Sequence, residues 1–301
     1  MLIRSSPEPA WSELSRSLAE ARGPGAGIIN RQPIGGGSIN SAFRADTREG
    51  VSYFVKLNRE ALLPMFEAEA EGLQELRRAG AIRVPEPVCH GAGHGYAWIV
   101  TEFIAFGRGN ARTQEIFGRQ FARMHRYTAD RFGWHRDNTI GSTPQINGWS
   151  DSWVGFYRRH RLGYQLQLAA DNGFKGSLQS MGERLISGLN SFFASYSPVP
   201  SLLHGDLWGG NQAADRDGNP VIFDPALYYG DREADLAMTE LFGGFSTAFY
   251  DAYNETWPLD DGYAVRKTLY NLYHILNHAN LFGGGYVMQA ETMMGQLLAE
   301  F

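Results

Sequence analysis

Asp206, Asn211 and Asp224 have the types, order and spacing that phosphoryl transfer requires of a base and two metal ligands. Transfer of a γ-phosphoryl group needs little covalent chemistry from a protein, which must instead orient a hydroxyl nucleophile and neutralise charge on the phosphate oxygens. A carboxylate can accept the hydroxyl proton, and carboxylate and carboxamide oxygens suit Mg²⁺. We therefore predict that Asp206 is the catalytic base and that Asn211 and Asp224 bind Mg²⁺.

The segment after Asn211 indicates how the chain returns to the same place. Residues 217–219 have a turn composition, and the apolar run 221–223 predicts a short buried strand that ends at Asp224. Asp, Asn and Gly are also common in ordinary turns, so each residue alone would indicate only a loop. Three roles in order, separated by a strand, favour a phosphotransfer site.

The bulk composition indicates a globular protein that acts on a small molecule. The 301 residues are 43% hydrophobic, which is enough for one large core or two moderate ones. The formal net charge is −5 without a long basic run, which argues against nucleic acid or an anionic membrane as partner. Cys89 is the single cysteine, which excludes an internal disulfide and fits a reducing compartment. Because no signal peptide or long apolar stretch is visible, we expect a cytoplasmic protein.

The first third of the chain predicts a small antiparallel sheet with two helices. Residues 10–21 and 65–79 have apolar residues at helical spacing, and each run ends at glycine. Apolar or alternating segments lie between and after them, separated by glycine-rich and charged turns. They predict strands at residues 28–34, 41–46, 52–57, 88–91 and 96–102.

Helical patterns dominate beyond the glycine-containing segment 107–110. They predict helices at residues 113–125, 149–172, 178–193, 235–242, 246–254 and 263–280. We assign the chain to the α+β class, with a first domain at residues 1–105 and a larger, mostly helical second domain at 106–301. A ligand cleft is expected between two such lobes, with the Asp206 segment on its floor.

The first domain offers a cation for a triphosphate. Lys56 ends an apolar strand in the context that kinases give their phosphate-binding lysine. Among the glutamates of the helix 65–79 we choose Glu69 as its partner, because Glu69 shares a helical face with the apolar residues that follow. We expect Glu67 and Glu71 to belong to a solvated face.

A glycine-rich turn separates the first two predicted strands. Glycine permits close backbone approach, so the N–H groups of this turn could contact phosphate oxygens. Asn40 stands where the third glycine of G-x-G-x-x-G would fall, and an ordinary hairpin turn is the alternative. The predicted phosphate contacts are Gly35, Gly36, Gly37 and Ser38.

The segment after the strand 96–102 would connect the two domains. Backbone groups in such a connector can hydrogen-bond an adenine edge while apolar side chains enclose the ring. An ordinary buried strand would have much the same composition. The predicted nucleotide contacts here are Glu102, Phe103 and Ile104.

Longer motifs extend beyond this general plan. HGDLWGGN is followed by FDPALYYGDREADLAMTELFGGF, and other segments read KLNREALLPMFEAEAEGLQEL, RVPEPV and LYHILNHANLFGGGY. Over nearly its full length the sequence resembles the fructosamine kinase family, or ketosamine-3-kinases, within the aminoglycoside-phosphotransferase-like branch of the protein-kinase fold. HGD with DP, in place of HRD with DFG, separates this branch from protein kinases.

The resemblance implies a bilobal kinase-like fold that uses ATP and Mg²⁺ to phosphorylate the 3-hydroxyl of ketoamines, the adducts of sugars on amines and protein lysines. It implies the same roles for Asp206, Asn211, Asp224, Lys56 and Glu69 as the residues themselves predict. The 3-phosphate then promotes elimination of the amine, which makes the family's role deglycation. Ribulosamine, erythrulosamine and fructosamine adducts all stay open as substrates. The alternatives are an aminoglycoside, choline or sugar kinase of the same fold, and a pseudokinase.

Substrate contacts are predicted at three positions. Trp208 could stack on the apolar face of a sugar, or it could be a core residue that braces the loop. Asn277 and His278 are the other predicted contacts. His274 and His278 share a helix face, but a zinc site would need a third ligand that the sequence does not offer.

Two further aspartates are predicted to brace the loop that carries Asp206, which we call the catalytic loop. Asp231 and Asp235 follow the second metal-ligand segment, and Asp235 precedes an apolar helical run as a cap would. We expect Arg232 to pair with one of them.

Overall fold

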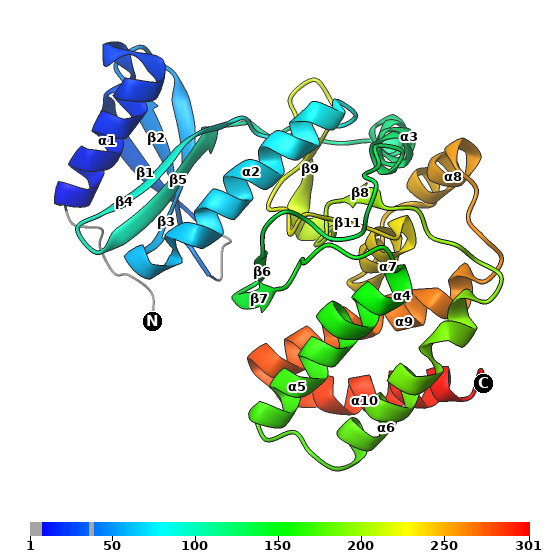
Figure 1. Ribbon diagram of the computed structural model, residues 1–301. Coiled ribbons are helices and arrows are strands. Elements are labelled where there is room, and N and C mark those ends of the chain that lie inside the picture. The colour runs from blue at the N-terminus through cyan, green and yellow to red at the C-terminus, as the bar shows by residue number, and fades with distance from the viewer. Residues whose placement is uncertain (1–7, 36–38) are drawn as a thin grey trace. The chain divides into compact units, whose positions relative to one another are not determined.

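The computed structural model describes residues 8–35 and 39–301 (Figure 1). Its contacts divide the chain into two compact units. The first unit runs to Gly109 and also takes in Ala213–Phe223, whereas the second consists of Asn110–Gln212 and Asp224–Phe301. The sequence predicted a single boundary after residue 105. The main difference is that residues 213–223 belong to the first unit, which the sequence pattern does not indicate.

The first unit is built on a five-stranded antiparallel sheet. The strands lie in the order β1 (Ile28–Ile34), β2 (Ser41–Thr47), β3 (Ser52–Arg59), β5 (Tyr96–Glu102) and β4 (Pro87–Gly93). β1 and β5 have the predicted bounds, and the other three are slightly longer than predicted.

Successive side chains of a strand point to opposite faces of the sheet, so its apolar residues form two separate clusters, each packed against a different helix. Val55 and Trp98 belong to a core cluster with Leu14 of α1 (Glu8–Arg22). Ile99, the next residue of β5, belongs to a separate cluster with Phe66 of α2 (Leu63–Ala79). The two helices therefore cover opposite faces of the sheet.

The returning segment forms a hairpin of β9 (Gln212–Ala214) and β10 (Pro220–Ile222). The Asp215 carboxylate accepts hydrogen bonds from the N–H groups of Asp217 at 3.0 Å and Asn219 at 2.9 Å, which closes the turn. The same carboxylate pairs with Arg83 at 2.7 Å, and the Arg83 carbonyl accepts from the N–H of Ile222 at 3.0 Å. The predicted turn and the strand after it are confirmed, with the strand one residue earlier than predicted.

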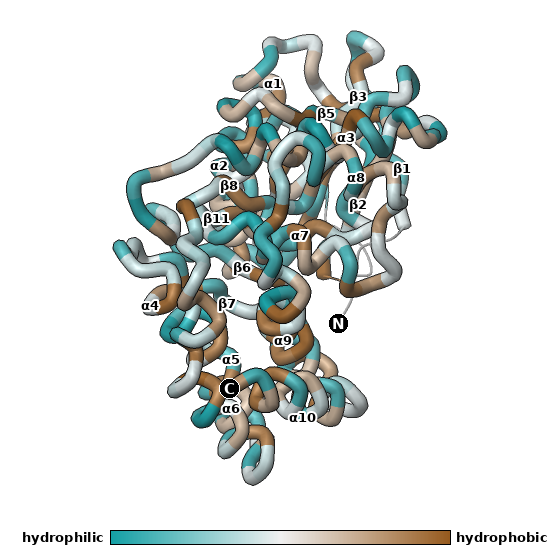
Figure 2. The backbone as a smooth tube through the Cα atoms, turned by 90° about the vertical axis from the view of Figure 1, so that its right-hand side faces the viewer, coloured by the Kyte–Doolittle hydropathy of each residue, from teal (hydrophilic) through white to brown (hydrophobic). Residues whose placement is uncertain are grey.

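The second unit is mostly helical. Its α-helices are α3 (Ala111–His125), α4 (Trp153–Tyr157), α5 (Tyr164–Asp171), α6 (Ser177–Gly188), α7 (Arg232–Leu241), α8 (Thr247–Thr256), α9 (Tyr263–Phe282) and α10 (Gly285–Leu298). Two short strand pairs complete it, namely β8 (Ser201–Leu203) with β11 (Tyr228–Gly230) and β6 (Asn138–Ile140) with β7 (Thr143–Gln145). α9 is buried along most of its length, and Figure 2 shows hydrophobic residues along much of it.

Some elements differ from the sequence prediction. The helix predicted at residues 149–172 begins only at Trp153, where the Ser152 side chain caps it, and it contains a π-helical stretch, η3 (Arg158–Gly163). α10 and the four short strands were not predicted, because three residues are too few to show alternation and the glycines before α10 indicate a helix end. Within the described ranges, no helix is both long and apolar enough to cross a membrane.

Candidate active site

The predicted base, Asp206, lies on a loop that follows β8 and is held by Asp235 of α7. The Asp235 carboxylate accepts hydrogen bonds from the backbone N–H groups of His204 at 2.6 Å and Gly205 at 2.7 Å. Gly205 has a φ of 84°, and a Cβ atom there would lie 2.0 Å from the carbonyl oxygen of Ala226, so glycine is required. Two charge-assisted hydrogen bonds thus fix the backbone directly before the predicted base.

A histidine and a tyrosine that the sequence did not single out hold Asp235 in turn. His125 and Asp235 are at most 1% exposed, and Nε2 of His125 lies 3.2 Å from Oδ2 of Asp235. Because a carboxylate only accepts, Nε2 carries the proton and Nδ1 accepts from the Tyr253 hydroxyl at 2.8 Å. Burial lowers the pKa of His125, which keeps the ring neutral. A lone histidine at the end of a helix gives no sequence signal for this role.

The prediction that Asp235 starts a helix is wrong, whereas its predicted bracing role is confirmed. α7 begins at Arg232, and its N-cap is Asp231, whose carboxylate accepts from the N–H of Glu233 at 3.0 Å. Asp235 lies one turn later, where its negative charge is also favoured by the helix N-terminus.

The electrostatic surroundings of Asp206 favour proton uptake. Burial raises the pKa of this carboxyl well above its ordinary value, and the charges of Asp224 and Asp235 raise it further. Asn211 opposes this effect, since its Nδ2 approaches the Asp206 carboxylate at 3.3 Å. Asp224 and Asn211, the two predicted metal ligands, thus both act on the electrostatics of Asp206.

The hydrogen bonds of Asn211 leave its carboxamide oxygen available to a cation. Nδ2 donates to the backbone carbonyl of Asp206 at 2.8 Å, so Oδ1 points the other way. Asp224 lies two residues after the hairpin of β9 and β10, and its charge acts on Asp206. The second unit therefore brings the three predicted residues into one neighbourhood, with hard oxygen donors only.

The predicted ion pair of the first unit is present. Nζ of Lys56 lies 2.7 Å from Oε1 of Glu69, and the two side chains are 9% and 12% exposed. Lys56 pairs across the sheet with Ile99, whose side chain packs against α2. Strand alternation thus directs Lys56 toward the helix that carries Glu69.

The glycine-rich turn is described only at its ends. Gly36, Gly37 and Ser38 lie outside the described residues, and Gly35 directly follows β1. Asn40, at the position of the missing third glycine, accepts a hydrogen bond from the Asn58 side chain at 2.7 Å. This bond ties the end of the turn to β3.

The connector after β5 uses some of the groups predicted to contact a nucleotide. The Glu102 carboxylate pairs with Arg83 at 2.8 Å, and the Glu102 N–H donates to the Glu86 carbonyl at 2.8 Å. The N–H of Glu102 is therefore not a nucleotide contact. The Arg44 guanidinium lies over the Phe103 ring, with its Cζ atom 5.1 Å from the centroid of the ring. The Ile104 N–H forms no hydrogen bond within the described part of the chain and stays available as a donor.

Trp208 is a surface residue, so the alternative of a core tryptophan is wrong. Its side chain is 40% exposed, and it lies over Gly210, where a Cβ atom would be 2.3 Å from the indole ring. The ring centroid lies 6.4 Å from that of Phe242, which is also exposed. An aromatic face is therefore presented two residues after the base.

His278 and Asn277 have different surroundings. His278 is half-buried, its ring contacts Phe242 with centroids 5.1 Å apart, and its Nδ1 donates to the carbonyl of His274 at 2.8 Å. Asn277 is 3% exposed and bonds inside the unit to Gln165 and Ile140, both at 3.3 Å. The prediction of a substrate contact at Asn277 is corrected, because its carboxamide is buried and both of its ends form hydrogen bonds within the core.

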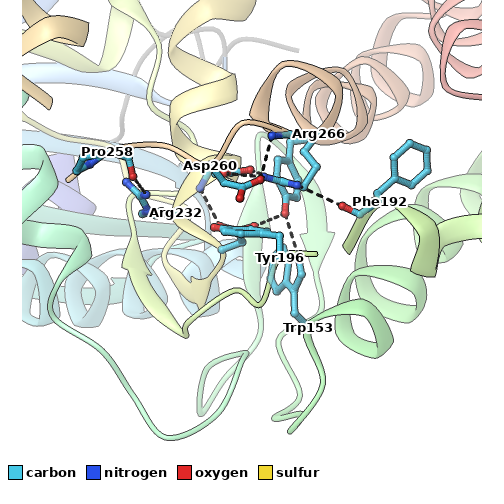
Figure 3. A network of polar contacts seen from close by, with 11 residues as sticks. Trp153, Phe192, Tyr196, Arg232, Pro258, Asp260 and Arg266 are labelled. Carbon is cyan, nitrogen blue, oxygen red and sulfur yellow. Dashed lines mark hydrogen bonds and ion pairs between the residues drawn. The ribbon is translucent and has the colours of Figure 1, made fainter. Parts of the chain in front are cut away.

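Buried polar groups support the start of α7 (Figure 3). Arg266 of α9 forms two hydrogen bonds with Glu233, at 2.7 and 3.1 Å, and one with Asp260 at 2.5 Å. Asp231 accepts from the hydroxyls of Tyr196 and Tyr270. These contacts fix the helix that presents Asp235 to the catalytic loop.

Arg232 does not pair with Asp231 or Asp235, so that prediction is wrong. Its guanidinium donates instead to the backbone carbonyls of Trp257 at 2.9 Å and Pro258 at 2.6 Å (Figure 3). Arg232 therefore ties α7 to the segment after α8.

Comparison with known proteins identifies relatives along the whole chain. The sequence model described as fructosamine kinase matches residues 10–300. A probable ketoamine kinase of Synechocystis sp. is 46% identical over 295 residues, which cover 98% of this chain and 98% of the relative. The chloroplastic protein-ribulosamine 3-kinase of Arabidopsis thaliana is 43% identical over 311 residues, which cover 99% of this chain and 94% of the plant protein.

Solved structures agree with these matches. A crystal structure from Haemophilus somnus 129PT that bears the name fructosamine-3-kinase has a TM-score of 0.87 at 30% identity, covering 97% of this chain and 98% of that one. The ADP-bound aminoglycoside phosphotransferase APH(2'')-Ib, at 12% identity and a TM-score of 0.63, shares the fold over 95% of this chain and 99% of its own. The predicted α+β kinase-like fold is confirmed, and the chain belongs to the fructosamine kinase family.

Proposed function

We propose that this kinase transfers the γ-phosphoryl group of ATP to the 3-hydroxyl of ketoamines, with Asp206 as the base. The observation that carries the proposal is the geometry around Asp206, since Asp235 holds the backbone directly before it and the Asn211 side chain lies 3.3 Å from its carboxylate. As the hydroxyl oxygen bonds to the γ-phosphorus, its proton passes to the Asp206 carboxylate and ADP leaves. Relatives named as ketoamine kinase and protein-ribulosamine 3-kinase support the acceptor class.

The donor set supports Mg²⁺ as the metal. Asn211 Oδ1 and the Asp224 carboxylate are hard oxygen ligands, and no group of three or more His, Cys, Asp or Glu side chains gathers as a metal site among the described residues. Few protein ligands suit Mg²⁺, which usually keeps water and substrate phosphates in its coordination sphere. When bound, Mg²⁺ neutralises charge on the phosphate oxygens.

The first unit supplies the nucleotide contacts in this proposal. Lys56, held by Glu69, is assigned to the phosphates, because the ion pair fixes an ammonium group with little freedom. The Ile104 N–H is assigned to the adenine edge. The glycine-rich turn at residues 35–38 is assigned to the phosphates on its sequence alone.

An exposed aromatic surface beside the catalytic loop is assigned to the acceptor. It consists of Trp208, Phe242, His278, Phe282 and Tyr286, whose neighbouring ring centroids lie 5.1 to 6.4 Å apart. Aromatic faces pack well against the C–H faces of sugars. Because the His278 Nδ1 donates to a carbonyl, its Nε2 is left as an acceptor for a sugar hydroxyl. Free and protein-bound ketoamines both fit a surface that is open to solvent.

An acceptor panel tests this function. Erythrulosyl, ribulosyl and fructosyl adducts of lysine are offered free and within a peptide, and ADP release is measured alongside the phosphorus NMR spectrum of the product. We expect phosphate on the 3-oxygen, and no turnover of a 3-O-methyl adduct that lacks the attacking hydroxyl. ADP release only with unglycated aminoglycosides, choline or simple sugars would overturn the proposed acceptor.

A further inference from the structure

Asp224 has a backbone conformation that its surroundings must hold. Its φ of 58° is in the left-handed region, where His94 is the other non-glycine residue in the described part of the chain. Such a conformation persists where neighbouring contacts over-determine it. The next residue, Pro225, has no N–H and adds no donor. Contacts of the residues that follow Pro225 are among the constraints on this conformation, and through the backbone they bear on where the Asp224 carboxylate lies.

Two side chains of the hairpin formed by β6 and β7 hold those residues. Nε2 of Gln145 donates to the carbonyl of Ala226 at 2.9 Å, and Nδ2 of Asn138 donates to the carbonyl of Leu227 at 2.8 Å. The N–H of Ala226 donates to the carbonyl of His204 at 2.9 Å. Residues 226–227 are thus fixed between the catalytic loop and the hairpin.

The two carboxamides also bind each other. Gln145 Nε2 donates to Asn138 Oδ1 at 2.8 Å, and Gln145 Oε1 accepts from the Tyr273 hydroxyl at 2.8 Å. Gln145 is 1% exposed, so its amide hydrogens and its oxygen all find their partners inside the protein. If the Gln145 carboxamide were flipped, its oxygen would face the Asn138 Oδ1 and the Ala226 carbonyl oxygen, which cannot donate a hydrogen bond. The donors and acceptors of this network therefore have only one possible assignment.

Arg161 and Asn147 fix the orientation of the Asn138 carboxamide. Nδ2 of Asn147 donates to Asn138 Oδ1 at 2.9 Å, and Oδ1 of Asn147 accepts from Nη2 of Arg161 at 2.8 Å. A guanidinium only donates, so Arg161 orients Asn147, and Asn147 orients Asn138. Asn147 and Arg161 are fully buried, where such a network specifies one arrangement.

We propose that Gln145 and Asn138 are positioning residues that set the Asp224 carboxylate for its metal. They act through the backbone of residues 226–227 and not on the reacting atoms. This inference rests on the proposed function, because it takes Asp224 to be a metal ligand. It assigns a role to a hairpin of two three-residue strands that the metal-ligand motif does not include.

Gln145→Met tests the inference, because it removes both amide hydrogens at nearly constant volume. Calorimetry measures ATP binding with excess Mn²⁺ and again in EDTA, without acceptor, and kinetics give the half-saturating Mg²⁺ concentration. We expect affinity for the Mn²⁺–ATP complex to fall about tenfold, metal-free ATP affinity to stay unchanged, and half-saturating Mg²⁺ to rise about tenfold. The matched control is Gln179→Met, because Gln179 Nε2 also donates to two backbone carbonyls, at 3.1 and 2.9 Å, far along the chain from this network.

Each outcome decides between the two proposals. Metal-dependent binding by Gln145→Met that equals that of Gln179→Met would overturn the inference alone. If the unsubstituted protein shows no metal-dependent ATP binding, the proposed function fails instead. Should Gln145→Met not fold, Tyr273→Phe takes its place, since it removes the hydroxyl that donates to the Gln145 oxygen. It is expected to raise half-saturating Mg²⁺ about threefold, and an unchanged value would overturn the inference.

Discussion

Oδ1 of Asp235 accepts a hydrogen bond from the backbone N–H of Gly205 at 2.7 Å, one residue before the predicted base. Oδ2 of the same carboxylate accepts from the N–H of His204 and from Nε2 of His125. One buried carboxylate thus joins the catalytic loop to two helices, α3 and α7.

Asp235→Asn should lower kcat about 10- to 100-fold, with the KM for ATP changed less than about twofold. The amide keeps the volume but loses the charge, and a hydrogen bond to a charged group contributes about 1.5–3 kcal/mol. Steady-state kinetics measure both constants. Glu240→Gln is the control, because Glu240 lies on the same helix and pairs with Lys267, away from the loop. An Asp235→Asn enzyme that keeps more than half of kcat would contradict the bracing role.

Lys56→Met should raise the KM for ATP and lower kcat, together reducing kcat/KM by at least about tenfold. The variant removes a charge-assisted phosphate contact, which contributes about 1.5–3 kcal/mol. Glu69→Gln should have a smaller effect in the same direction, since it only frees the ammonium group. Lys267→Met, which breaks the more exposed pair with Glu240, is the comparison. Equal kinetics for the two lysine variants would exclude the phosphate role.

Trp208→Ala should raise the KM for the ketoamine about tenfold and leave the KM for ATP unchanged. Loss of one aromatic face from a sugar site costs about 1–2 kcal/mol. Trp149→Ala is a matched control, because Trp149 is 39% exposed against 40% for Trp208 and lies outside the aromatic surface. If both substitutions shift the acceptor KM equally, the aromatic surface is not the acceptor site.

Arg266→Met should lower the free energy of unfolding by about 3–5 kcal/mol, because it leaves the Glu233 carboxylate buried without its main partner. The double variant Arg266→Met/Glu233→Met should be more stable than the single one. Urea denaturation at neutral pH gives both values. A single variant as stable as the double would show that the pair is not coupled.

The contribution of His274 to the stability of the folded protein should decrease as the pH falls below about 6.5, the ordinary pKa of histidine. Burial lowers the pKa of His274 to about 3, and Arg161 adds to the effect while Asp235 opposes it. At His274 the unfolded chain therefore binds a proton between these values that the folded chain does not, and the contribution of this residue to stability falls by about 1.4 kcal/mol per pH unit. His274→Gln should flatten the dependence between pH 6.5 and 5, as measured by urea denaturation. An unchanged slope would show that His274 does not titrate in this way.

The regular elements of the first unit were predictable because local rules decide them. β1 and β5 were predicted exactly, since strand alternation and flanking turn residues give both ends. α10 and the β6–β7 hairpin were not, because a helix after paired glycines and strands of three residues have no clear local signature. The hairpin matters most, as it carries Gln145 and Asn138.

The sequence by itself indicated the family and predicted the chemistry. The order of Asp206, Asn211 and Asp224 indicated a base and two metal ligands, because charge handling in phosphoryl transfer constrains residue types. The partnership of Lys56 with Glu69 followed from strand and helix periodicity, and the structure has that pair. The inference of this pair succeeded because it depends on residue identity and on short spacings along the chain, whereas the roles of Asp206, Asn211 and Asp224 stay predictions.

Only the tertiary structure decided which groups support the candidate site and which form contacts in the core instead. His125 lies 110 residues before Asp235, and Gln145 lies 81 residues before Ala226, so no local pattern links either pair. Asn277 and His278 are neighbours in sequence, yet burial commits one to the core and leaves the other half exposed. The physical reason is that hydrogen bonds between distant segments and the burial of individual side chains arise only when the helices and strands have packed.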